Sequence, residues 1–437
     1  MVNEDFSDQE QICVGIELGT QFNFYIRDIN FPQSLYQQNK VKFDKDPSLQ
    51  SALGALGKSF VFVSKDSDYW KKVRPAVTKS LYTDNRDEIY EQIKQKIIKE
   101  VESNPFKLDT EYNYLPDLLN IMSSALSKSF YEVDLSKDLI SQLQNGNMIK
   151  RSVSESLINS FKVQFIKTFD KLNMIFPFLM QYGIGVSNSE QTYNQSQINK
   201  YFQKIIAINK KQQGSNQNHK VIQNLIKHIQ LPDEQLSIEL CLFWLGILDN
   251  TLSSLNNTLQ LLASNPTPRH KLEDLIQNGS QKDQLEYARL CILESLRMFS
   301  TNPFSSPQGI LSDGQIGEYY FKKGDIIRID YDYIHYHKDI WQRPQEYIPE
   351  RFDFNNPLYL QPNGKKRGIY SFLAFGSGKR ICPGADFIEN VGAIFLIELM
   401  KRYRFENLGN SVFMNLYQLY KPNIQMMVKK QKNTDIF

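Results

Sequence analysis

The chain contains few cysteines and no cluster of metal-binding residues, which removes several protein classes at once. Its 437 residues include four cysteines, Cys13, Cys241, Cys291 and Cys382, which lie far apart, and only five histidines. This spacing excludes a disulfide-stapled scaffold and a zinc site of the finger type. It favours a reducing compartment.

Charge of one sign and long apolar runs are also lacking. The formal net charge is +3, too small to predict binding to nucleic acid. No run approaches the ~20 apolar residues that a helix needs to cross a bilayer, and no secretory signal is present. With 41% hydrophobic residues the chain can still bury a substantial core. These features agree with a large soluble enzyme.

Cys382 has the most informative surroundings in the chain. It lies in the glycine-rich segment 375–384, FGSGKRICPG, ahead of an expected helix at 385–403. Gly376 and Gly378 allow tight turns and a close approach of the backbone to a flat ligand. Arg380 and the N-terminus of the next helix both favour a deprotonated thiol. The pattern predicts a thiolate that is the axial ligand of a haem iron, whereas a lone cysteine would be read as structural.

Two further pairs have helical spacing. Glu294 and Arg297 are three residues apart and can form an ion pair on one helical face. Trp70 and Arg74 are four apart in an expected helix at 68–81, so both side chains point the same way. The second pair is also compatible with an ordinary amphipathic surface helix. Downstream of the first pair, Arg351 lies in the sequence Pro-Glu-Arg-Phe.

Together these motifs resemble the cytochrome P450 superfamily over most of the chain. The resemblance implies a mainly α fold with a small β subdomain and a long central helix over haem b, in a single domain at residues 1–437. It implies that Cys382 binds the iron, and that Glu294, Arg297 and Arg351 form a structural triad. The implied cofactor-binding residues are Cys382, Arg380, Trp70, Arg74, Phe375 and Gly376, with Arg380, Trp70 and Arg74 at the propionates.

The central helix, expected at 233–264, departs from the family pattern. Gly246 and Asp249 match the turn over the distal haem face, where the family has an acid followed by an alcohol that helps to deliver protons. Asn250 occupies the position of the alcohol. An amide orients water but does not pass a proton as a hydroxyl does, and Thr251 lies about 100° further around the helix. Asp249 and Asn250 are the predicted catalytic residues, although Asn250 also fits a satisfied polar residue.

Asn250, with the run at 169–179, also resembles the branch that contains sterol 7-alpha-hydroxylases and prostacyclin synthase. Three functions therefore stay open. The first is a monooxygenase that inserts one oxygen atom from dioxygen into a sterol, lipid or similar hydrophobic substrate. The second is a reductase-independent isomerase or dehydratase of lipid hydroperoxides or endoperoxides. The third is a non-catalytic haem-binding or lipid-binding pseudoenzyme. The expected substrate pocket includes Phe243, Ile247, Phe304 and Met414.

The remaining expectations concern architecture and location. We expect a first hairpin at 13–26 and helical regions at 84–104 and 115–182, broken by Pro105, Pro116 and Pro177. We also expect a hairpin at 321–327 and a polar, loosely ordered insert at 187–224, in which 198–208 can form a short helix. The family's membrane anchor and first helix are not seen ahead of the first hairpin. We therefore expect the endoplasmic reticulum membrane, on its cytoplasmic face, if an anchor was lost from the gene model, and the cytoplasm otherwise.

The expected electron donor is an NADPH–cytochrome P450 reductase or a similar protein. A membrane surface is a further possible partner. An acidic reductase would be steered to a basic proximal face. The cationic residues expected on that face are Lys71, Lys72, Lys365, Lys366, Arg367, Lys379, Lys401 and Arg402.

Overall fold

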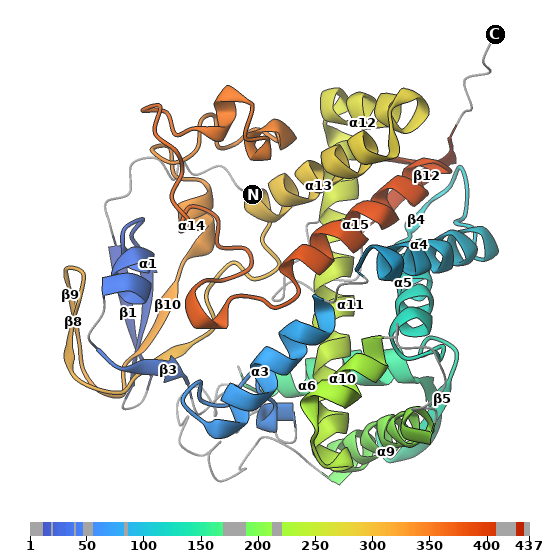
Figure 1. Ribbon diagram of the computed structural model, residues 1–437, viewed down its shortest axis with the longest axis horizontal. Coiled ribbons are helices and arrows are strands. Elements are labelled where there is room, and N and C mark those ends of the chain that lie inside the picture. Colours follow the sequence, from blue (N-terminus) through green and yellow to red (C-terminus); the bar gives the residue numbers. More distant parts are fainter. Residues whose placement is uncertain are drawn as a thin grey trace.

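One long helix, α11 (Asp233–Ser264), runs through the middle of the molecule, and the other helices pack around it (Figure 1). The computed structural model describes residues 12–18, 21–38, 41–46, 56–82, 86–168, 189–211, 221–407 and 425–431. Within these ranges α11 is the one helix that is long and apolar enough to cross a membrane by length and composition, but 78% of its apolar window is buried in the protein. It is therefore the core helix of this fold.

The helices account for most of the ordered chain. Three of the described helices begin with side-chain caps: Ser67 accepts from the backbone of Trp70 at the start of α3, Ser280 and Asp283 form a capping box at the start of α13, and Asp330 caps α14. Besides α11, the described helices are α1 (Phe31–Gln33), α3 (Asp68–Leu81), α4 (Arg86–Ser103), α5 (Leu115–Phe130), α6 (Val153–Thr168), α9 (Ser189–Lys211), α10 (Val221–Ile229), α12 (Pro266–Asn278), α13 (Gln281–Met298), α14 (Tyr331–His335) and α15 (Ala385–Met400). The short helical turns are η2 (Ser34–Gln38), η3 (Leu56–Lys58), η4 (Pro349–Phe352), η5 (Pro357–Tyr359) and η6 (Gly378–Arg380).

A mixed five-stranded sheet lies at one side of the helices (Figure 1). Its order is β1-β2-β10-β7-β3, and only the β2–β10 pair is parallel. Its strands are β1 (Ile12–Leu18), β2 (Gln21–Arg27), β3 (Phe43–Lys45), β7 (Gln308–Ile310) and β10 (Ile326–Ile329). The smaller sheets contain β4 (Glu111–Asn113), β11 (Tyr403–Glu406) and β12 (Gln425–Lys430), then β5 (Leu139–Gln144) with β6 (Asn147–Ser152), and β8 (Gly314–Ile316) with β9 (Tyr319–Phe321).

The apolar core is divided in the same way. A large cluster joins α11 to the helices around it, and a smaller one lies under the five-stranded sheet and includes Phe31, Ile329 and Trp341. This arrangement confirms the predicted fold class, mainly α with a small β subdomain. The predicted α3, α11 and first hairpin are present with bounds within a residue or two of those expected.

The prediction that residues 115–182 are helical, with breaks only at prolines, is wrong at 139–152. The chain leaves α5 at Phe130, forms the hairpin β5–β6, and returns to a helix at Val153. The hairpin turns at Asn145 and Gly146, whose φ angles are 52° and 77°. Positive φ at both central residues defines the turn that Asn-Gly favours between antiparallel strands. Residues 169–188 lie outside the described part of the chain.

Two other local predictions are corrected. The segment 187–224 is not a loosely ordered insert where the structure describes it, because it contains all of α9 and the start of α10. The apolar side chains of Ile198, Phe202 and Ile205 are buried along one face of α9, which explains the helix. The predicted hairpin at 321–327 is also absent: β9 pairs with β8, whereas β10 pairs with β2 and β7.

Candidate functional site

The Cys382 loop is a tight turn that ends at the start of α15. Gly376 and Gly378 have φ angles of 71° and 65°, which strain any other residue, and a Cβ on Gly378 would lie 2.9 Å from the ring of Tyr36. The backbone N–H of Cys382 donates to the carbonyl of Phe375 at 2.8 Å. This closes the loop and holds Phe375 and the sulfur on the same short segment.

The groups around the Cys382 thiol have opposite effects on its pKa. Burial raises the pKa of Cys382, while the backbone N–H of Gly384 and the nearby Arg74 guanidinium lower it. The N–H of Gly384 lies 3.4 Å from Sγ. Because α15 begins at Ala385, the positive end of its dipole also favours a thiolate. The loop therefore presents a sulfur that a cation or a metal would hold deprotonated.

A cavity of about 620 Å³ lies between this loop and α11. Cys382 and Phe375 line one side of the cavity, and Phe243, Ile247 and Phe304, three of the predicted pocket residues, also line it. The fourth, Met414, lies outside the described residues. A cavity of this size with mostly apolar walls and a reactive sulfur is the expected form of a cofactor and substrate site.

The α11 side of the cavity carries the predicted amide. Asn250 lines the cavity, and its Nδ2 donates to the carbonyl of Gly246, one helical turn earlier, at 2.9 Å. This bond leaves Oδ1 as the acceptor available to a ligand or water. Asp249, half-buried, is not among the lining residues, and Thr251 is fully buried behind the lining. The structure thus brings Asn250 to the site but not the carboxylate that precedes it.

Trp70 and Arg74 reach the cavity from α3. Both line it, and they lie on the same side of α3, the direction that their spacing predicted. The guanidinium of Arg74 donates to the carbonyl of Ile381 at 2.6 Å and to the hydroxyl of Thr78 at 2.6 Å. It therefore also ties α3 to the Cys382 loop, a contact that the sequence did not reveal.

Arg380 lies at the same edge of the cavity and holds the loop to the sheet. It donates to Asp44 at 2.8 Å and to the carbonyls of Val61 and Val63, and its guanidinium lies 5.6 Å from the ring centre of Trp70. Its Nε is buried and has no hydrogen-bond partner among the described residues. One donor of Arg380 is therefore still available to a ligand.

The segment that carries Phe60 and Val61 into the cavity wall is also fixed to α11. Glu239 is buried on α11 and accepts hydrogen bonds from the Ser59 hydroxyl at 2.7 Å, the Phe60 N–H at 3.0 Å and the Tyr69 hydroxyl. Burial raises the pKa of Glu239, and these donors partly offset that effect. With Arg380 on the other side, the wall is held from two directions.

The charge of the cavity lining is strongly unbalanced. Five cationic side chains line it, and only one carboxylate does. The cations are Lys45, Lys65, Arg74, Lys379 and Arg380, and the carboxylate is Asp44. Sequence reasoning missed Lys45 and Asp44, because β3 reaches the cavity only by pairing with β7 and gives no local signal. Four of these cations are half-buried and Lys379 is exposed, and an excess of positive charge over carboxylates around a cavity suits an anionic occupant.

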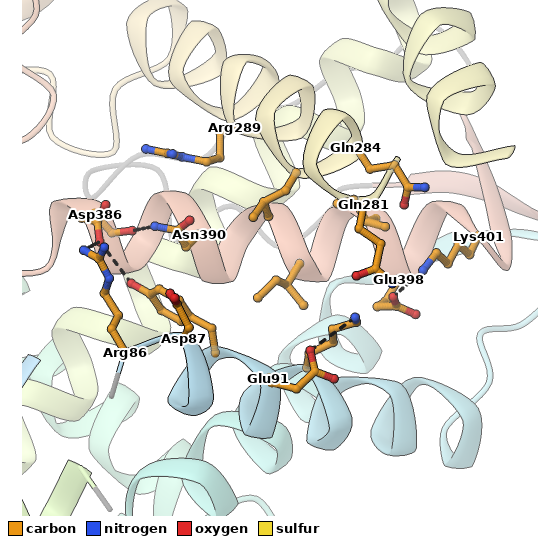
Figure 2. A pocket seen from close by; sticks show the side chains of 15 residues that line it. Arg86, Asp87, Glu91, Gln281, Gln284, Arg289, Asp386, Asn390, Glu398 and Lys401 are labelled. Carbon is orange, nitrogen blue, oxygen red and sulfur yellow. Dashed lines mark hydrogen bonds and ion pairs between the residues drawn. The ribbon is translucent and has the colours of Figure 1, made fainter. Parts of the chain in front are cut away.

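A second cavity shows that this imbalance is specific to the first. It has a volume of about 320 Å³ and lies between α4, α13 and α15 (Figure 2). Four cations and four carboxylates line it, and they form ion pairs such as Arg86–Asp386 and Lys401–Glu398. Because its charges are balanced internally, nothing in its lining indicates a charged ligand.

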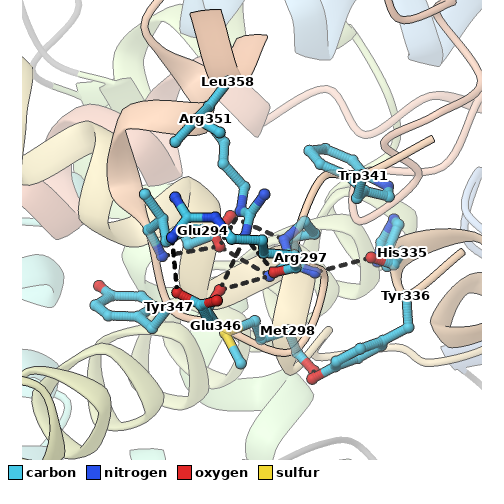
Figure 3. Close-up of polar contacts among 12 residues, drawn as sticks. Glu294, Arg297, Met298, His335, Tyr336, Trp341, Glu346, Tyr347, Arg351 and Leu358 are labelled. Carbon is cyan, nitrogen blue, oxygen red and sulfur yellow. Dashed lines mark hydrogen bonds and ion pairs between the residues drawn. The ribbon is translucent and has the colours of Figure 1, made fainter. Parts of the chain in front are cut away.

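The structure brings together Glu294, Arg297 and Arg351 behind the site (Figure 3). All three side chains are fully buried. Glu294 accepts from Nε and Nη2 of Arg297 at 2.8 Å each, from Nε of Arg351 at 2.9 Å, and from the backbone of Ile348 at 3.1 Å. Arg297 also donates to the carbonyl of His335 at 2.8 Å. This network joins α13 to the loop that leads to Cys382.

The residues present fit a haem. The Cys382 sulfur can bind a metal, Phe375 and the positive-φ glycines leave room for a flat ring, and the cationic edge suits propionates. The buried Nε of Arg380 without a partner among the described residues is one donor that such a carboxylate would satisfy.

Comparisons with known proteins agree with this geometry. A family model described as cytochrome P450 matches residues 4–431. Psoralen synthase of Pastinaca sativa is 24% identical over 371 residues, 80% of this chain and 73% of that protein. Cytochrome P450 82A2 of Glycine max is 20% identical over 406 residues, 87% and 76% of the two chains. A crystal structure of the cytochrome P450 CYP102L1 has a TM-score of 0.73 at 15% identity and covers 97% of this chain and 92% of its own, so the fold is shared.

Proposed function

Since the chain belongs to the cytochrome P450 family, whose members are haem b monooxygenases, we propose that it oxidises a sterol, lipid or similar hydrophobic substrate with electrons from an NADPH-dependent reductase. The observation that carries the proposal is one cavity that joins the Cys382 loop to apolar walls from α11. Haem with a thiolate ligand supplies the means to cleave dioxygen and insert one of its atoms into a bound molecule.

In this proposal Cys382 is the iron ligand, and Trp70, Arg74 and Arg380 hold the propionates. Phe375 packs against the ring. Glu294, Arg297 and Arg351 do not touch the cofactor; they hold the loop that positions it. Arg74 and the dipole of α15 favour the thiolate, and a bound iron would hold the sulfur deprotonated against the burial that raises its pKa.

Asn250 is proposed to orient water in the cavity. With Nδ2 engaged by the carbonyl of Gly246, Oδ1 can accept a hydrogen bond from a water or from a substrate hydroxyl. Asp249 lies beside the lining on the same turn, and its proposed role is to exchange protons with that water rather than to contact the substrate.

The substrate class follows from the walls. Phe243, Ile247 and Phe304 are apolar residues that face the cavity, and Phe60 and Leu242 extend the same lining. Such a lining favours ligands that bury apolar area. Titration of the purified protein with a panel of sterols, fatty acids and small polar compounds, followed by the haem absorption spectrum, tests this class. A panel in which only small polar compounds shift the spectrum would contradict it.

The second candidate is a reductase-independent isomerase or dehydratase, and Asn250 is the observation that favours it. The amide replaces a hydroxyl that a proton relay would use, whereas rearrangement of a peroxide needs no proton delivery to dioxygen. Lipid hydroperoxides should then be turned over without NADPH. A protein that is silent with hydroperoxides but active with NADPH and reductase excludes this candidate.

The reductase is proposed to dock where Lys71, Lys72, Lys365, Lys366 and Lys379 are exposed. The three other cations expected there are engaged with buried side chains. Arg367 stacks on Trp341, with 4.1 Å from its guanidinium carbon to the ring centre, and Lys401 and Arg402 are ion-paired with Glu398. Lys379→Glu should slow reduction at low salt more than at high salt. We propose attachment at the endoplasmic reticulum surface, which fractionation of the expressed gene would test.

A further inference from the structure

Lys45 is a cavity residue whose ammonium group has no hydrogen-bond or ion-pair partner among the described residues. It ends β3, pairs with Gln308 of β7, and lines the same cavity as Cys382. The neighbouring carboxylate of Asp44 is already used by Arg380 at 2.8 Å and by the hydroxyl of Ser64 at 2.6 Å.

The environment of this amine is unfavourable to its charge. Burial, and then the nearby guanidinium of Arg380, lower the pKa of Lys45 to about 7, while Asp44 opposes the shift only in part. A buried ammonium is tolerated when an anion accompanies it. The described residues supply one carboxylate for five cations around the cavity. A ligand that carries a negative charge would therefore stabilise the charged form of Lys45.

The two arginines at this edge use their terminal nitrogens in bonds to the protein. Arg74 donates to the carbonyl of Ile381, and the terminal nitrogens of Arg380 donate to Asp44 and to two backbone carbonyls. Lys45 has all three ammonium donors available on a flexible side chain. It can therefore reorient toward a carboxylate to which the two arginines have few donors left to offer.

We propose that Lys45 binds a carboxylate inside the cavity, at the edge formed by β3 and Arg380. Two sources have this chemistry: a haem propionate and the acid group of a lipid substrate. The first source follows from the family's cofactor alone, while the second rests on the proposed substrate class. The ammonium donates to the carboxylate oxygens and replaces their lost hydration.

The test compares Lys45→Met with two controls. Lys45→Arg keeps the charge, and Lys42→Met removes an exposed lysine three residues away in the same part of the chain. Each holoprotein is mixed with excess apomyoglobin, and the rate of haem transfer is followed by absorbance. The measurement is repeated after loading with protohaem dimethyl ester, which has no propionate charge. A second arm titrates each protein with dodecanoic acid and with its methyl ester.

If the carboxylate bound by Lys45 is a haem propionate, Lys45→Met releases haem roughly 10- to 100-fold faster than the wild type, as expected for a lost charged hydrogen bond. The difference should vanish with the dimethyl ester, and Lys42→Met should match the wild type. If the substrate is the source, haem release is unchanged, but dodecanoic acid binds more weakly to Lys45→Met while its methyl ester does not.

The proposal would be overturned if Lys45→Met and the wild type released haem at the same rate and also bound dodecanoic acid with the same affinity as each other. Failure of the proposed function is a separate result, because the sterol and fatty-acid panel would then leave the haem spectrum of the wild type and of all variants unchanged, while the haem-transfer arm would still report on Lys45. If Lys45→Met yields no holoprotein, Lys45→Gln replaces it, and the wild type loaded with the two porphyrins tests the propionate arm without any substitution.

Discussion

Replacing Glu294 with glutamine is expected to destabilise the protein severely although Glu294 touches neither cofactor nor substrate. Its carboxylate accepts three arginine N–H bonds and one backbone N–H, all within a region that water does not reach. An amide of the same shape keeps one acceptor and points two donors at the guanidinium groups of Arg297 and Arg351. Both arginines then remain buried without a counter-charge.

The size of the expected loss in stability follows from the complete burial of Glu294 and its two arginine partners. Removing one partner of a fully buried ion pair costs about 3–5 kcal/mol, and here one carboxylate serves two arginines. A folded domain has a total stability of about 5–15 kcal/mol, so the change removes much of it. The matched control is Glu346→Gln, because Glu346 forms an arginine pair of the same spacing with Arg343, but both side chains are 55% exposed. That change should cost about 1 kcal/mol or less.

Chemical denaturation of both holoproteins, followed by far-ultraviolet circular dichroism and by haem absorbance, measures the two effects side by side. We expect the transition of Glu294→Gln to move to much lower denaturant and that of Glu346→Gln to stay near the wild type. Two transitions that coincide would refute the reasoning, because burial would then have no influence on what the carboxylate contributes.

Three other outcomes are expected. Cys382→Ser should fold but lose the carbonyl spectrum of a thiolate-bound haem, and retention of that spectrum would exclude Cys382 as the ligand. Asn250→Thr should raise the product formed per NADPH consumed, because a hydroxyl can relay a proton, whereas an unchanged ratio would remove Asn250 from proton delivery. Asp332→Asn should stabilise the protein above neutral pH, since burial and then Asp330 raise the pKa of Asp332 to about 8. The folded state keeps that proton after the unfolded chain has lost it, so stability falls from about pH 4 to pH 8 in the wild type; denaturation across that range should be flatter in the variant.

Motifs held together by short sequence spacing were predicted well. The Trp70/Arg74 pair lies on one face of α3, and Glu294 and Arg297 form their ion pair on α13, because helical periodicity alone places residues three or four apart together. Arg351 joins them from a distant segment, and that contact came from the family resemblance rather than from spacing.

Contacts that depend on strand pairing could not be predicted. Lys45 reaches the cavity only because β3 pairs with β7, which is more than 250 residues away in the chain. The hairpin β5–β6 was missed for a different reason: Asn145 and Gly146 signal a turn, but the apolar spacing around them also fits a helix. Local periodicity does not decide between the two structures in such a segment.

The surplus of positive charge around the main cavity links folding to cofactor supply. Any ligand that binds the native state but not the unfolded chain adds to stability by mass action, and an anionic macrocycle also relieves the mutual repulsion of Lys45, Arg380 and their neighbours. The amount of intact enzyme in a cell should therefore follow the rate of porphyrin synthesis, with newly made chains degraded when that supply is short.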